Sequence, residues 1–232
     1  MVLKTAGGKE LDLDISTLFK GHYVEHNSYA NVILNQINSG MYNGYLIGNE
    51  KTLLDLGGNV GLFSLWAHDR VEKILSVEPT QSHINVFQEL LDIHHITNVH
   101  ICKAAISDKS GFLSLYENKS NTTMNSLVNS PHSTGIKDKV MAYGLYDFIV
   151  ENRIDQIDFI KMDIEGSEMN VIPSEQFKKA CPHIKRIFVE VHDFESFNFS
   201  LIGRNVTRIE QEMQAAGFKV KRHGPDGLDC SK

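Results

Sequence analysis

The sequence predicts an α/β fold, built as a doubly wound, mostly parallel sheet of the Rossmann-like kind. Short apolar runs of four to eight residues alternate with segments of helical periodicity, the pattern of a parallel sheet covered by helices. A glycine-rich turn leads directly from one such run, which begins at Thr52, into a helix. A closing helix over 204–216 and a short last strand over 218–220 suit a sheet that ends with one antiparallel strand.

The individual elements follow from hydrophobic periodicity and from their end signals. Strands are expected at 52–56, 73–78, 99–106, 112–116, 159–162, 187–193 and 218–220. Helices are expected at 62–66, from Thr80 to Leu91, at 145–149, around Phe177 and at 204–216. These strands and helices place one domain over 51–223, with an N-terminal extension over 1–50 and a frayed tail over 224–232.

Two segments are candidates for a lid over a ligand. The extension holds a short alternating run at Leu11, Leu13 and Ile15 and a helical turn near 31–37, together with several rings: Tyr23, Tyr29, Tyr42, Tyr45, His22 and His26. These rings either pack on the sheet or close over a site. The second segment, 117–139, is rich in Asn, Ser, Thr, Pro and Gly, and loops of this length inside a domain are often functional.

Composition and charge exclude several classes of protein. The chain has 232 residues with 41% hydrophobic and 22% charged residues, values typical of a globular protein with one sizeable core. The formal net charge of −6 disfavours a nucleic-acid partner. The first residues lack the apolar run of a secretion signal and no later run is long enough to span a membrane, so a cytoplasmic protein is expected.

The glycine-rich turn is the strongest functional motif. Asp55 lies just inside the end of the first strong strand, and Gly57, Gly58, Asn59 and Gly61 follow it. Glycines let a backbone take positive φ and approach a ligand, and the following helix N-terminus offers free N–H groups. A dinucleotide fingerprint would need a third glycine at position 62, which is leucine. The spacing instead fits the D-x-G-x-G-x-G turn of proteins that bind S-adenosylmethionine (SAM), with Asn59 in place of the middle glycine.

A second acidic residue supports a nucleotide site. Glu78 ends the next apolar strand, roughly 20 residues after the turn, where a carboxylate that binds ribose hydroxyls is expected, and Pro79 follows it. Small residues at Ala104 and Ala105 end the third strand and leave room for a flat ring. The cofactor-binding residues predicted from the sequence are therefore Asp55, Gly57, Gly58, Asn59, Gly61, Glu78, Pro79 and Ala105.

Polar residues gather at the ends of two later strands. Asp163 and Glu165 follow the strand at 159–162, while Glu190 and His192 lie at the end of the strand at 187–193. Ligands of open parallel sheets bind beyond the carboxyl ends of the strands, so these groups are candidates for catalysis. Glu168 either orients a neighbouring side chain or forms a structural ion pair.

Five motifs together resemble the FkbM family of SAM-dependent methyltransferases. They are D-L-G-G-N-V-G at 55–61, V-E-P at 77–79, A-I-S-D with a following glycine at 105–111, I-D-F-I-K-M-D-I-E-G-S-E at 157–168 and V-E-V-H at 189–192. The resemblance implies a seven-stranded class I methyltransferase sheet, SAM as cofactor, and O-methylation of a hydroxyl on a sugar or a natural-product-like small molecule. It leaves the acceptor undefined.

A hydroxyl that attacks a methyl group must lose its proton to a base or be acidified by a metal. Asp163, Glu190 and His192 are the predicted catalytic residues. The same three side chains could instead hold a divalent cation such as Mg²⁺, which is the lesser alternative. Two other classes stay open at this point: an NAD-dependent oxidoreductase, and a SAM- or nucleotide-binding protein without catalytic activity.

Overall fold

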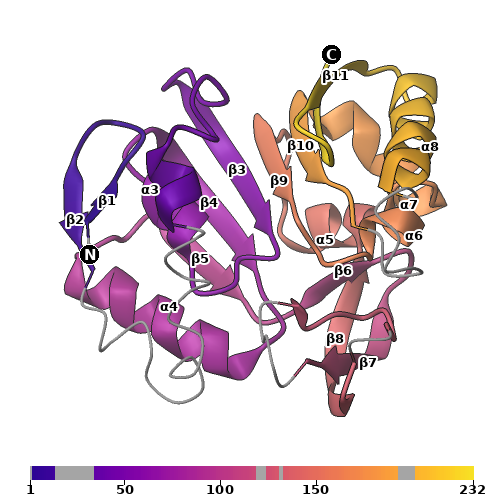
Figure 1. Cartoon of the computed structure of the whole chain (residues 1–232), viewed down its shortest axis with the longest axis horizontal. Helices are drawn as coiled ribbons and strands as arrows, with labels where there is room; N and C mark the ends of the chain where they lie inside the picture. Colours follow the sequence, from indigo (N-terminus) through magenta and orange to yellow (C-terminus); the bar gives the residue numbers. More distant parts are fainter. Residues whose placement is uncertain (1, 14–33, 119–123, 131–132, 193–201) are drawn as a thin grey trace. The chain divides into compact units, whose positions relative to one another are not determined.

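A computed structural model describes residues 2–13, 34–118, 124–130, 133–192 and 202–232 (Figure 1). The chain divides into two compact units, Met1–Lys103 and Ala104–Lys232. The sequence predicts a single domain over 51–223. The boundary between the two compact units lies inside the predicted third strand, 99–106.

The first unit is built on three parallel strands in the order β3-β4-β5. Its elements are β1 (Val2–Lys4), β2 (Glu10–Asp12), β3 (Glu50–Leu56), α3 (Leu62–Ala67), β4 (Val71–Val77), α4 (Gln81–Ile93) and β5 (Val99–Cys102). Leu53, Leu54 and Leu56 are fully buried, as expected for a parallel strand that is covered on both faces. The helix α4 buries Phe87, Leu90 and Leu91 along one stripe.

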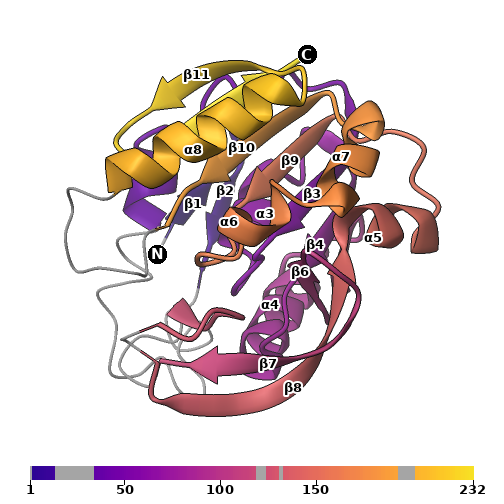
Figure 2. The ribbon, with the colours of Figure 1, turned by 90° about the vertical axis from the view of Figure 1, so that its right-hand side faces the viewer.

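The second unit contributes four strands in the order β11-β12-β10-β9, with helix α8 alongside (Figure 2). Its elements are β6 (Ala105–Ser107), β7 (Gly111–Glu117), β8 (Gly135–Gly144), α5 (Leu145–Glu151), β9 (Phe159–Met162), α6 (Glu168–Val171), α7 (Glu175–Ala180), the 3₁₀ turn η2 (Cys181–His183), β10 (Arg186–Glu190), α8 (Ile202–Ala215), β11 (Lys219–His223) and β12 (Gly227–Ser231). The helix α8 buries Val206, Ile209 and Met213 at helical spacing. Among the described strands of the main sheet, β12 is antiparallel to its neighbours β10 and β11.

The predicted frayed tail is wrong for most of its length. Residues Gly227–Ser231 form β12, which pairs with β10 on one side and β11 on the other. Leu228 and Cys230 have no exposed surface. The alternation of these two apolar residues with polar ones is the pattern of a half-buried strand, but the run is short and follows Gly224 and Pro225.

The predicted third strand is also corrected by the structure. It divides into β5, which pairs with β4, and β6, which pairs with β8 in a separate three-stranded sheet of order β6-β8-β7. The stretch from 99 to 106 contains no Gly or Pro at the division, so periodicity alone could not locate the break. Residues 135–139, which the sequence predicts to be a loop, form the first half of β8 in the same small sheet.

The N-terminal extension is only partly within the described residues. The β1–β2 hairpin includes Leu11 but not a longer strand through Leu13, and Ile15, His22, Tyr23, His26 and Tyr29 lie outside the described residues. Tyr42 packs against Phe63 and Trp66 of α3, with ring centroids 4.8 and 5.7 Å away. This tyrosine therefore stabilises α3 rather than covering an open site.

The predicted fold class is confirmed. In the described residues the main sheet has seven strands, mostly parallel, and helices connect them in an α/β arrangement. Within the described part of the chain, no helix combines the length and hydropathy needed to cross a bilayer.

Candidate active site

The glycine-rich turn in the first unit lies at the carboxyl end of β3 and is fastened to β4. The N–H groups of Gly57 and Gly58 both donate to the carbonyl of Val77, at 3.0 and 3.1 Å. Gly57, Asn59 and Gly61 have φ values of 83°, 49° and 87°. This left-handed backbone is what glycine tolerates and most other residues do not. The predicted turn is therefore present as a fixed structure.

Two of these positions have no room for a side chain. A Cβ on Gly58 would lie 2.0 Å from the Oγ of Ser76, and one on Gly61 would lie 2.1 Å from the ring of Phe87 in α4. The glycines therefore let the turn pack closely on β4 and α4.

Asp55 stabilises the turn through hydrogen bonds of its buried side chain. Its side chain has no exposed surface, and its Oδ2 accepts hydrogen bonds from Ser64 Oγ at 2.6 Å and Ser76 Oγ at 3.3 Å. These bonds link β3 to α3 and β4. The two serines carry no recognisable motif, so sequence reasoning missed them.

Glu78 lies at the carboxyl end of β4 and joins three segments. Its Oε2 accepts the backbone N–H of Asn59 at 2.9 Å, and its Oε1 accepts that of Thr80 at 2.8 Å and lies 3.2 Å from Nδ1 of His83. Burial raises the pKa of Glu78, but the hydrogen bond and charge of His83 and the bonds from Thr80 outweigh it, so the pKa is lowered. The carboxylate is therefore ionised and can accept further donors.

These residues fit a SAM-type cofactor. The turn carries no side chains at Gly57, Gly58 and Gly61, and an ionised acceptor lies beside it at Glu78. Of the predicted cofactor residues, Pro79 is half-buried in the same unit. Ala105 is in the second unit, where it pairs with Ala142 of β8 and is 6% exposed.

The second unit holds a cluster of ionisable side chains after β9 and β10. Asp163 follows β9, and its Oδ2 lies 3.0 Å from the Nζ of the buried Lys161. Glu165 has a left-handed backbone with φ of 51°, which is uncommon outside glycine. Its carbonyl accepts a hydrogen bond from Ser126 Oγ at 2.5 Å. The short turn therefore directs the Asp163 and Glu165 side chains toward the end of β10.

His192 is the centre of this cluster. Its Nε2 lies 3.6 Å from Oδ1 of Asp163 and 3.7 Å from Oε2 of Glu165, while its Nδ1 lies 3.0 Å from Oε1 of Glu168. The His192 side chain is 20% exposed, and that of Glu168 is fully buried. The structure thus brings together two of the predicted catalytic residues, Asp163 and His192, and adds Glu165 and Glu168.

The carboxyl groups of the cluster have shifted pKa values. Burial raises the pKa of Asp163, but the charges of Lys161 and His192 outweigh it and lower this pKa. Burial raises the pKa of Glu165 to about 8 despite the opposing charge of His192. The charge of Asp163 and burial together raise the pKa of Glu190 to about 7. At neutral pH the cluster therefore holds protons that ordinary carboxyl groups would have released.

The pKa of His192 is raised well above 6.5. Burial lowers it, but the charges of Glu165 and Glu168 and the hydrogen bond to Glu168 have the larger combined effect. Protonated imidazole is thus favoured at neutral pH, and the neutral form becomes more populated as the pH rises.

The same cluster offers ligand atoms for a cation. One atom each from Asp163, Glu165 and His192 lies within 4.8 Å of the others, so the set differs from the predicted one by having Glu165 in place of Glu190. Lys161 already faces Asp163, and protonated His192 faces both carboxylates. Two cationic side chains therefore supply the charge compensation, and we interpret the cluster as a proton-binding group.

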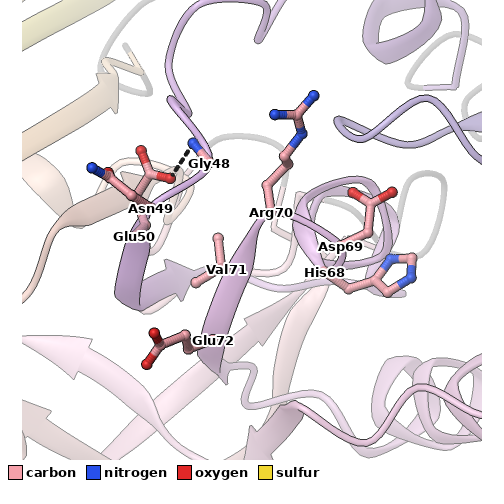
Figure 3. A pocket seen from close by; sticks show the side chains of 8 residues that line it. All are labelled: Gly48, Asn49, Glu50, His68, Asp69, Arg70, Val71 and Glu72. Atoms are coloured by element: carbon pink, nitrogen blue, oxygen red, sulfur yellow. Dashed lines mark hydrogen bonds between the residues drawn. The ribbon is translucent and has the colours of Figure 1, made fainter.

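A polar pocket of about 250 Å³ lies at the opposite end of β3 and β4 from the glycine-rich turn (Figure 3). Its lining residues are Gly48, Asn49, Glu50, His68, Asp69, Arg70, Val71 and Glu72. Glu50 is buried, but its carboxylate already accepts the N–H groups of Ile47 and Gly48, at 2.7 and 2.8 Å. Because α/β sheets bind ligands at the carboxyl ends of their strands, this pocket is not part of the candidate active site.

Comparison with known proteins identifies the family. The family model described as "Methyltransferase FkbM domain" matches residues 55–220. No curated protein sequence matches the chain.

Solved structures resemble the chain at low sequence identity. Methyltransferase FkbM from Methylobacillus flagellatus KT has a TM-score of 0.51 and 17% identity over 83% of this chain, and the chain spans about half (47%) of that protein. A ribosomal protein L11 methylase from Lactobacillus delbrueckii subsp. bulgaricus gives a TM-score of 0.48 and 15% identity, with 84% of this chain and 75% of that one covered.

The likeness to the Methylobacillus structure supports the fold, and the family model extends from Asp55 of the glycine-rich turn, past the His192 cluster, to β11. It covers well over half of the chain and includes the five motifs that predicted the resemblance, so that prediction is confirmed. The chain therefore belongs to the FkbM methyltransferase family.

Proposed function

We propose that this protein is a SAM-dependent O-methyltransferase that acts on a hydroxyl group of a small molecule or saccharide. The observation that carries the proposal is His192, whose Nδ1 faces a buried carboxylate while its Nε2 faces two half-buried ones. An imidazole held in this way can accept a proton and stabilise the resulting charge. Methylation of a hydroxyl needs such a group, because the oxygen must lose its proton during attack.

The glycine-rich turn, with Glu78 beside it, would hold the cofactor in the first unit. SAM supplies an electrophilic methyl group and leaves as S-adenosylhomocysteine. The glycines of the turn would let the cofactor approach the backbone closely, while Glu78 would accept hydrogen bonds from ribose hydroxyls.

His192 would take the hydroxyl proton of the acceptor in the second unit. Asp163, whose pKa is lowered, lies close enough to its Nε2 to stabilise the imidazolium that forms, and Glu165 adds to this effect at pH values where it is ionised. Because the carboxylates raise the pKa of His192, the imidazole binds the proton more strongly than a free histidine would. The same effect lowers the fraction of neutral base at pH 7, so activity should increase toward alkaline pH.

An acceptor screen tests the proposal directly. The protein is incubated with SAM and panels of monosaccharides, polyols, phenols and hydroxylated natural products, and S-adenosylhomocysteine release is measured. Amines, thiols and RNA serve as comparison panels. Turnover with hydroxyl compounds supports the proposal, whereas turnover confined to another panel contradicts O-methylation. SAM binding without turnover in any panel would support the non-catalytic alternative.

Replacement of Glu78 tests the cofactor site. We expect Glu78→Ala to weaken SAM binding about 10- to 100-fold, because a charged hydrogen-bond acceptor contributes roughly 1.5–3 kcal/mol. Isothermal titration calorimetry measures the affinity. Since Glu78 also holds the turn through Asn59, the free energy of unfolding must be measured alongside.

A matched control for this prediction is Glu72→Ala, which removes an exposed glutamate from the same strand, β4. It should leave SAM affinity unchanged. If Glu78→Ala keeps normal affinity while its fold is intact, the carboxylate has only a structural role.

A further inference from the structure

Glu168 connects the two chain segments that form the cluster. It is the first residue of α6 and has no exposed surface. Its Oε2 accepts the backbone N–H of Gly166 at 3.0 Å, in the turn that follows Asp163. Its Oε1 accepts the backbone N–H of His192 at 2.6 Å and lies 3.0 Å from the Nδ1 of the same residue.

These contacts determine which ring nitrogen of His192 carries the hydrogen atom when the imidazole is neutral. Both oxygens of the Glu168 carboxylate act as acceptors of backbone N–H groups, so the ring nitrogen that faces this carboxylate is the N–H form. In neutral His192 the hydrogen therefore resides on Nδ1, and the lone pair resides on Nε2. Because the backbone N–H of His192 donates to the same oxygen, Glu168 holds His192 through both its main chain and its ring.

We infer that Glu168 is the positioning residue of the proposed methyltransferase site: it fixes His192 with Nδ1 as donor, so that Nε2 is the atom that receives the acceptor's proton. This inference rests on the proposed function for its catalytic meaning. The proton leaves the acceptor oxygen, resides on Nε2 between Asp163 and Glu165, and passes to solvent when the imidazolium is deprotonated.

The proposal separates the roles of the acidic residues. Asp163 and Glu165 face Nε2 and act on the proton that arrives there. Glu168 faces Nδ1 and selects the tautomer. Glu190 and Lys161 also influence the cluster through their charges, Lys161 by pairing with Asp163. A carboxylate that supports the distal side of a general-base histidine is a recurring arrangement in hydrolases, where it holds the productive tautomer.

The wild-type protein provides the first test, and it needs no acceptor. Two-bond ¹H–¹⁵N correlation spectra of histidine-labelled protein report the tautomer and pKa of each imidazole, and the spectrum of His192→Gln assigns the signal of His192. We expect the Nδ1–H tautomer in the neutral form and a pKa above that of a free histidine. The Nε2–H tautomer at His192 would overturn the inference.

Glu168→Gln is the second test. Gln cannot satisfy all three donors, because one end of its amide is an NH₂ group that would face an N–H of Gly166 or His192. We expect the pKa of His192 to fall by about one to two pH units, since a charged hydrogen-bond partner is lost, and the Nε2–H tautomer to appear. The kcat should fall by about 10-fold or more, with the Kd for SAM nearly unchanged.

Two further variants distinguish a positioning role of Glu168 from a non-specific effect of the substitution on the protein. Glu175→Gln, which neutralises an exposed glutamate at the start of α7, should change neither the His192 signal nor kcat. Glu168→Asp keeps the charge but shortens the side chain, and it should restore the Nδ1–H tautomer in part and with it part of kcat. An unchanged tautomer and pKa in Glu168→Gln would overturn the inference.

The spectroscopic and catalytic readouts also separate this inference from the proposed function. If His192 shows the expected tautomer and its dependence on Glu168, yet no hydroxyl compound is methylated, the positioning role stands and the proposed reaction is wrong. If hydroxyl compounds are methylated while the tautomer is insensitive to Glu168, the reaction stands and the positioning role is wrong. When Glu168→Gln does not fold, the wild-type tautomer alone decides.

Discussion

His192→Ala is expected to lower kcat by roughly 10²–10⁴-fold, the range that general-base catalysis contributes. The Kd for SAM should stay nearly the same, because the proposed role of the imidazole is confined to the transition state. Alanine keeps the backbone N–H that donates to Glu168, so the end of β10 remains attached to α6. Single-turnover kinetics and calorimetry measure the two quantities.

The matched control is His100→Ala, which removes an exposed histidine from β5. It should leave kcat and SAM affinity unchanged. A near-normal kcat in His192→Ala would mean that positioning of the reactants is enough and that the His192 cluster is structural.

The pH profile of the wild-type enzyme gives the same prediction a second readout. Only neutral imidazole accepts a proton, so kcat/KM should rise with pH as His192 is deprotonated. Since the neighbouring carboxylates raise the pKa of His192 well above 6.5, the midpoint of the rise should lie on the alkaline side of that value. A midpoint at or below 6.5 would contradict the raised pKa.

A chelator distinguishes general-base catalysis by His192 from catalysis by a bound metal ion. We expect EDTA to leave the activity unchanged, because Lys161 and His192 provide the positive charge in this cluster. If EDTA abolishes activity and added Mg²⁺ or another divalent cation restores it, Asp163, Glu165 and His192 are ligands and the hydroxyl is acidified by the metal.

The second large effect is expected at Gly61. Gly61→Ala should reduce the free energy of unfolding by roughly 2–5 kcal/mol, the sum of a left-handed backbone cost and of overpacking. The new Cβ would lie 2.1 Å from the ring of Phe87, at a backbone φ of 87°. Because the turn and α4 must separate to relieve this contact, SAM affinity should fall as well. Urea unfolding and calorimetry measure both effects.

Gly217→Ala separates the two contributions. Gly217 has nearly the same φ, 88°, but a Cβ there would meet nothing within 4 Å. We therefore expect only the backbone cost, about 1–2 kcal/mol. A double-mutant cycle with Phe87→Leu should show favourable coupling to Gly61→Ala, because the smaller side chain makes room. Equal destabilisation in Gly61→Ala and Gly217→Ala would show that packing against Phe87 is not the reason for the glycine.

Local sequence pattern was sufficient for the elements that carry the motifs. The strands ending at Leu56, Val77 and Met162 are short runs that are mostly apolar toward their carboxyl ends, as a parallel sheet buried on both faces requires. Boundaries set by pairing with distant strands were not predictable in the same way. The end of β5, the start of β6 and the strand β12 depend on partners in β4, β8, β10 and β11.

The sequence by itself determined the α/β class, the glycine-rich turn with Glu78, and the family, because all three depend on residue types at short spacings. Only the tertiary structure decided which acidic residues surround His192. Glu168 lies 24 positions from His192 along the chain, and its side chain reaches the imidazole because β9 and β10 are neighbouring parallel strands. The tertiary structure also set the proton affinities, since burial and the summed charges of Asp163, Glu165 and Glu168 act through space rather than along the sequence.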